Sequence, residues 1–150
     1  MGITARVERH ITESLRSGVS RFCQDHPEVA AVFLFGSQGT PAERANSDID
    51  LALLFLPGKI PDLRGEMQLT DDLSRIFGRD DIDLVVLDKA PMFLLRRVVI
   101  EGMILIETDY LVVSDFLEMV YRFGPDYDYR RRQFCRDYDA ALKEAYGKNG

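Results

Sequence analysis

Short apolar runs separated by stretches of helical periodicity place the tightest constraint on the fold of this chain. The first run, Val29–Phe35, is apolar throughout, partly β-branched or aromatic, and followed by Gly36, as in a buried strand that ends in a turn. Similar runs recur at Leu51–Leu56, Leu84–Leu87 and Met103–Ile106. Each run is short enough for a strand, so the sequence predicts four strands.

Apolar residues at helical spacing fill the segments around these runs. Proline stands near the first turn of one such segment, and Gly124-Pro125 interrupts the last. The predicted helices are about Thr4–Gln24, a stretch around Met67–Phe77, Pro91–Glu101, Ser114–Phe123 and Tyr129–Tyr146. This alternation predicts an α/β (α+β) fold in which a small mixed β-sheet is flanked by helices.

The length and composition fit one folded domain. With 150 residues, 46% of them hydrophobic, we expect a single domain over residues 1–150 with a C-terminal helical extension over about 111–146.

The net charge of -6 argues against binding to duplex nucleic acid, because such binding depends on lysine and arginine. Met1–Arg9 lacks the apolar core of a signal peptide, and no apolar run approaches the roughly 18 residues that span a bilayer. We therefore expect a soluble, cytoplasmic protein without a membrane segment.

The segment Gly36–Asp50 (GSQGTPAERANSDID) carries the most informative polar residues. It places Gly36 and Ser37 directly after one strand, and Asp48-Ile49-Asp50 at the start of the next. Because alternate side chains of a strand share a face, Asp48 and Asp50 are expected to point the same way. Gly36 leaves room for phosphate oxygens, and Ser37 offers a hydroxyl and a backbone N–H that bind them.

Two adjacent carboxylates repel each other and need a cation. Mg²⁺ prefers oxygen ligands, and two such ions roughly 3.5 to 4 Å apart can hold a triphosphate while activating an attacking oxygen. A third carboxylate is then expected, and Asp83 precedes its apolar run as Asp50 precedes its own. Asp83 is the preferred candidate, and Asp81, on the same strand face, is the alternative. The pattern thus predicts Asp48, Asp50 and Asp83 as metal-binding catalytic residues, with Asp83 as a ligand or a general base.

The order Gly-Ser, about ten residues, then Asp-x-Asp resembles the nucleotidyltransferase superfamily related to DNA polymerase β, and stands here as Gly36-Ser37 and Asp48-Ile49-Asp50. The Ser47–Leu51 context, the Asp83–Leu87 strand and the segment Leu94–Glu107 look like the minimal nucleotidyltransferase, or MNT, subgroup. The resemblance spans roughly Val29–Tyr138 and implies the nucleotidyltransferase fold for this chain.

Members of the MNT subgroup are often antitoxins of HEPN-domain ribonuclease toxins, and some add AMP from ATP to a toxin tyrosine. The resemblance therefore implies ATP as substrate, Mg²⁺ as cofactor and a HEPN-domain toxin as partner, and it leaves a possible homo-oligomer open. One departure concerns the loop, where many members carry an Arg-Gly pair a few residues after Gly-Ser. This chain has Thr40-Pro41 there, and Arg44 is the candidate substitute.

Two other functions are compatible with the same residues. A small-molecule nucleotidyltransferase of the aminoglycoside-modifying kind would use the same aspartates, although the chain is short for such an enzyme. An antitoxin that acts by binding alone would keep the fold without turnover. The intact aspartates speak against that second alternative, and Thr40-Pro41 speaks for it.

Overall fold

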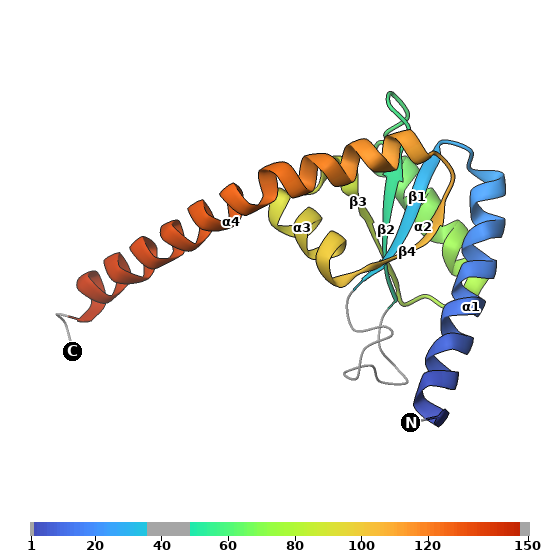
Figure 1. The fold of residues 1–150 in the computed structure, drawn as a ribbon, viewed down its shortest axis with the longest axis horizontal. Helices are drawn as coiled ribbons and strands as arrows, with labels where there is room; N and C mark the ends of the chain where they lie inside the picture. The colour runs from blue at the N-terminus through green and yellow to red at the C-terminus, as the bar shows by residue number, and fades with distance from the viewer. Residues whose placement is uncertain (1, 36–48, 148–150) are drawn as a thin grey trace.

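One four-stranded sheet with helices on both faces organises the computed structural model of the protein, which describes residues 2–35 and 49–147 (Figure 1). The strands lie in the order β3-β2-β1-β4. Along the chain the elements are α1 (Gly2–Asp25), β1 (Val29–Phe35), β2 (Ile49–Phe55), α2 (Leu63–Phe77), β3 (Ile82–Val86), a short 3-10 helix η1 (Leu87–Lys89), α3 (Met92–Glu101), β4 (Met103–Glu107) and α4 (Tyr110–Gly147).

The sheet is mixed, as the sequence predicts. Strand β1 pairs with β2 and with β4 in antiparallel fashion, whereas β2 pairs with β3 in parallel. All seven residues of β1 are buried, because the strand is central and both of its faces are covered. Its unbroken apolar sequence is the composition that such a strand requires.

Alternate residues of the central strands supply two apolar cores, one on each face of the sheet. On one face, Val32 of β1 and Leu51 of β2 pack with buried residues of α1 and α2 such as Phe22 and Leu73. On the other face, Phe33 and Leu54 pack with buried residues of α3 and α4. Figure 1 shows the same division, with α1 and α4 on opposite sides of the strands.

Helix α2 has well-formed ends that fix where β3 begins. Asp62 caps its first turn, since the Asp62 carboxylate accepts a hydrogen bond of 2.8 Å from the N–H of Gly65. At its other end Gly78 adopts the left-handed conformation, with φ 64°, which costs glycine little. The N–H of Arg79 then donates to the carbonyl of Ser74 at 3.1 Å, and the chain turns toward β3.

The C-terminal region differs from the sequence prediction. We expected two helices with a break at Gly124-Pro125, but α4 is a single helix over Tyr110–Gly147 that contains Pro125, so the predicted break is wrong. A proline costs the helix one hydrogen bond, yet α4 continues through Pro125 while it packs against α3. Gly124 is buried against Arg96 of α3, whose Nη1 would lie 3.1 Å from a Cβ at that position. The glycine thus permits a close helix crossing rather than ending the helix.

Other boundaries agree closely with the prediction, with two informative shifts. Strands β2 and β3 begin at Ile49 and Ile82, so Asp50 and Asp83 lie inside their strands rather than before them.

No helix of the described residues is long and apolar enough to cross a membrane.

Candidate active site

Two of the predicted carboxylates lie side by side on neighbouring strands. In the parallel pairing of β2 with β3, Asp50 is the register partner of Asp83. On the other side of β2, Asp50 is the partner of Phe35, the last residue of β1. Asp50 therefore lies between the end of β1 and the acidic position of β3.

Both carboxylates belong to the sheet face that α3 and α4 cover. Side chains alternate along a strand, and Ala52 and Leu54 of β2 belong to the core on that face, as does Phe35. Val85 of β3 packs there too. Asp50 is half-buried and Asp83 is exposed, so solvent reaches the end of the two strands at which they lie.

The remaining predicted site residues lie outside the part of the chain that the structure describes. These are Gly36, Ser37 and Asp48, together with the loop positions Thr40, Pro41 and Arg44. The flanking residues are described, however, and they locate the ends of this segment. Gly36 follows Phe35 directly, Asp48 precedes the buried Ile49 directly, and both ends adjoin Asp50. Phe35 and Ile49, the described residues that flank this segment, therefore lie at the same end of the sheet.

Asp81, the alternative third carboxylate, is already engaged by a cation. The guanidinium of Arg79 donates from Nε to Asp81 Oδ1 at 2.7 Å and from Nη2 to Oδ2. These hydrogen bonds lower the pKa of the Asp81 carboxyl from its ordinary value. The backbone carbonyl of Asp81 accepts a 3.0 Å hydrogen bond from the N–H of Ile49. This arrangement favours Asp83 over Asp81 as the partner of Asp50.

Sequence reasoning missed two residues that shape this edge. Arg79 is one, and its signal in the sequence was a cation two residues before Asp81, the residue that directly precedes β3. Gly102, at the end of α3, is the other: an added Cβ would lie 2.8 Å from the carbonyl oxygen of Leu34 and 2.4 Å from that of Val98. Because these are backbone atoms, only glycine fits so close to the end of β1.

The described carboxylates fit a divalent cation only in part. Asp50 and Asp83 are hard oxygen donors on adjacent strands, the donor type that Mg²⁺ prefers. Within residues 2–35 and 49–147, no group of three or more His, Cys, Asp or Glu residues is arranged to hold a metal ion. A site built on Asp50 and Asp83 would thus need a further ligand, and the predicted one, Asp48, lies outside the described residues.

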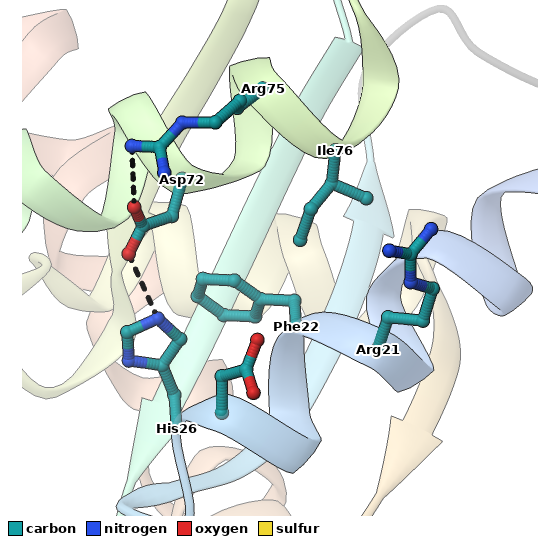
Figure 2. Close-up of a pocket in the computed structure, with 7 residues that line it drawn as sticks. Arg21, Phe22, His26, Asp72, Arg75 and Ile76 are labelled. Atoms are coloured by element: carbon teal, nitrogen blue, oxygen red, sulfur yellow. Dashed lines mark hydrogen bonds and ion pairs between the residues drawn. The ribbon is translucent and has the colours of Figure 1, made fainter.

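A separate pocket of about 360 Å³ lies between α1 and α2 on the opposite face of the sheet. Figure 2 shows His26 pointing at Asp72, whose second oxygen meets Arg75. The other ring nitrogen of His26 lies 3.1 Å from Glu28, and its ring packs against Phe22. These contacts satisfy both nitrogens of the imidazole. The pocket is remote from the carboxylates of the candidate site.

The sequence matches the family described as Polymerase beta, Nucleotidyltransferase over residues 18–111. The chain belongs to this nucleotidyltransferase family, which confirms the predicted fold class and the predicted enzyme class. No curated protein matches the chain.

Solved structures narrow the likeness to the MNT type. A chain of the MntA–HpeT toxin–antitoxin complex, in a tyrosine-to-alanine variant, is 27% identical, with a TM-score of 0.64 and coverage of 80% of this chain and 94% of that one. A chain of a toxin–antitoxin complex with AMP-PNP is 25% identical, with a TM-score of 0.69 and coverage of 82% and 97%. A chain from the complex of a tri-AMPylated Shewanella oneidensis HEPN toxin with its MNT antitoxin is 23% identical, with a TM-score of 0.66 and coverage of 85% and 98%, and shares the fold. The predicted resemblance to the MNT subgroup is confirmed.

Proposed function

We propose that this protein is a Mg²⁺-dependent nucleotidyltransferase that transfers AMP from ATP to a tyrosine of a cognate HEPN-domain toxin, and so acts as an antitoxin. The observation that carries the proposal is the register pairing of Asp50 with Asp83 beside the end of β1. Membership of the polymerase β nucleotidyltransferase family supports the reaction class. Two of the similar structures support the substrate and the acceptor, since one contains AMP-PNP and another an AMPylated HEPN toxin.

The roles of the residues follow from the chemistry of adenylyl transfer. Asp48, Asp50 and Asp83 would hold the cation, which supplies positive charge to the triphosphate. Gly36 and Ser37 would contact the phosphates. The tyrosine oxygen forms a bond to the α-phosphorus, the bond to pyrophosphate breaks, and the phenolic proton passes to solvent or to Asp83 acting as a base. The proposal places this reaction in the cytoplasm.

Intact-mass analysis tests the proposal directly. The chain is incubated with ATP, Mg²⁺ and a candidate HEPN-domain toxin from the same organism, and the intact mass of each component is measured afterwards. We expect the toxin to gain one or more AMP units, and removal of Mg²⁺ by a chelator to prevent the gain. An unchanged toxin, with a folded antitoxin and Mg²⁺ present, would contradict the proposal.

A matched pair of substitutions assigns the activity to the site. The double variant Asp48→Asn, Asp50→Asn is expected to lose transfer by at least about 100-fold, since catalytic ligands are removed. The control Asp71→Asn makes the same chemical change on the exposed surface of α2 and is expected to keep full activity. If the double variant still protects cells from the toxin, the protein acts by binding alone. Transfer to a small molecule in the absence of any toxin would favour the aminoglycoside-type alternative.

A further inference from the structure

We propose that Arg79 and Asp81 form a positioning pair that fixes β3 against β2 and thereby sets Asp83 opposite Asp50. This inference rests on the proposed function, because it gives the pair a role in the same site. Neither residue needs to touch the nucleotide, the metal or the acceptor. Their effect is exerted through the backbone that carries the two aspartates.

The first link joins Arg79 to the end of α2. Gly78 ends this helix in the left-handed conformation, and the N–H of Arg79 donates to the carbonyl of Ser74 at 3.1 Å. The backbone of Arg79 is therefore fixed by the helix end. Helix α2 is itself anchored on the sheet by the buried Leu69 and Leu73.

The second link joins the Arg79 side chain to Asp81. The two nitrogens of the guanidinium contact the two carboxylate oxygens, with Nε 2.7 Å from Oδ1. A planar, two-point contact of this kind fixes orientation, which a lysine with its single ammonium group does not do. The pair is about one-third exposed, with side-chain exposures of 35% and 33%, so we expect its effect to be geometric rather than a large gain in stability.

The third link joins Asp81 to β2. Its backbone carbonyl accepts the 3.0 Å hydrogen bond from the N–H of Ile49, the first residue of β2. The next pairs along the two strands are Ile49 with Ile82 and Asp50 with Asp83. Because a slip of one residue would turn a side chain to the opposite face, the start of the pairing decides whether the two aspartates meet.

The test combines three variants: Arg79→Gln, Asp81→Asn and the double variant. We expect each single variant to raise the apparent Mg²⁺ half-saturation for transfer by about tenfold, the range in which groups that orient metal ligands act. The double variant is expected to be no worse than either single variant, because the two residues act as one unit. The conservative variant Arg79→Lys is expected to keep only part of the wild-type Mg²⁺ affinity, because an ammonium group cannot make the two-point contact.

Amide hydrogen exchange at Ile49 supplies a readout that does not need activity. We expect its exchange to quicken at least about tenfold in all three variants relative to wild type, because the hydrogen bond to Asp81 becomes intermittent. The matched control is Arg75→Gln, which removes an arginine–aspartate pair within α2, with the Arg75 side chain 77% exposed. This control is expected to change neither the exchange of Ile49 nor the Mg²⁺ dependence.

Several outcomes would overturn the inference. Unchanged exchange at Ile49 in the variants would show that the pair does not fix the strand. A much larger Mg²⁺ effect for Asp81→Asn than for Arg79→Gln would make Asp81 a metal ligand instead. If wild type binds no nucleotide with Mg²⁺ and transfers none, the proposed function fails, and the pair's role in that site fails with it. If wild type is active and the variants show the same Mg²⁺ dependence and the same exchange at Ile49, the proposed function stands and the positioning role alone fails.

Discussion

Asp88 shows how a single carboxylate holds the end of β2 that lies farthest from the candidate site. Its Oδ2 accepts a 3.0 Å hydrogen bond from the N–H of Phe55, a residue only 1% exposed. Burial raises the pKa of the Asp88 carboxyl, and the hydrogen bond from Phe55 partly opposes that rise. The structural role of Asp88 is therefore to supply an acceptor oxygen for the N–H of Phe55.

Replacing Asp88 separates the acceptor from the charge. We expect Asp88→Ala to lower the free energy of unfolding by about 1–3 kcal/mol, because the buried N–H of Phe55 loses its partner. Asp88→Asn keeps an acceptor oxygen and removes the desolvated charge, so its loss is expected to be smaller. Urea denaturation at neutral pH measures both variants. Equal stability of wild type and Asp88→Ala would show that water replaces the carboxylate at no cost.

At the scale of elements, α1 and α2 approach each other closely at Gly18. An added Cβ there would lie 2.5 Å from Cε1 of Phe77 and 3.2 Å from Cγ2 of Ile76. Phe77 is half-buried and packs against the core of that face, so its ring has limited room to move. The glycine is thus a requirement of helix packing rather than a flaw in α1.

The substitution Gly18→Ala tests this helix contact. Alanine improves helix propensity by roughly 1 kcal/mol, whereas overpacking costs typically about 1–3 kcal/mol. We therefore expect a net loss of stability, measured as a lower midpoint of thermal unfolding. Adding Phe77→Leu, which shortens the obstructing side chain, is expected to recover part of the loss. A more stable Gly18→Ala variant would mean that the Phe77 ring moves aside at little cost.

The sequence predicted the elements well because their signals are local. Apolar runs located all four strands, and helical periodicity located the helices to within a few residues at most ends. The pairing of Asp50 with Asp83 depends on strand order and register, which no local pattern contains, and the sequence supplied only the expectation that the acids converge. The contact of Arg79 with Asp81 and the tight fit of Gly102 are tertiary features and were missed for the same reason. The break at Gly124-Pro125 was wrong because packing on α3 overrides a local helix-breaking signal.

At the scale of the whole molecule, the outer half of α4 stands apart from the sheet and the other helices (Figure 1). The last residue of α4 in the buried core of its face is Val120. Of residues 126–147, those whose side chains the structure describes are all exposed. The described side chains of this part of the helix therefore contribute little to the stability of the fold.

A truncated chain that ends at residue 126 tests that conclusion. We expect its free energy of unfolding to lie within about 0.5 kcal/mol of the full-length value, since the side chains that the structure describes in the removed part are exposed. Urea denaturation at two protein concentrations measures the difference and reveals any contribution of self-association. A loss of more than about 1 kcal/mol would show that the outer half of α4 is packed against something in solution.

The unbroken path of α4 through Pro125 also has a hydrodynamic consequence. A compact chain of this length has a radius of gyration of about 15 Å. Residues 126–147 alone form a rod of roughly 33 Å, at about 1.5 Å per residue. The protein therefore tumbles as an elongated body, and it diffuses more slowly than a sphere of the same mass.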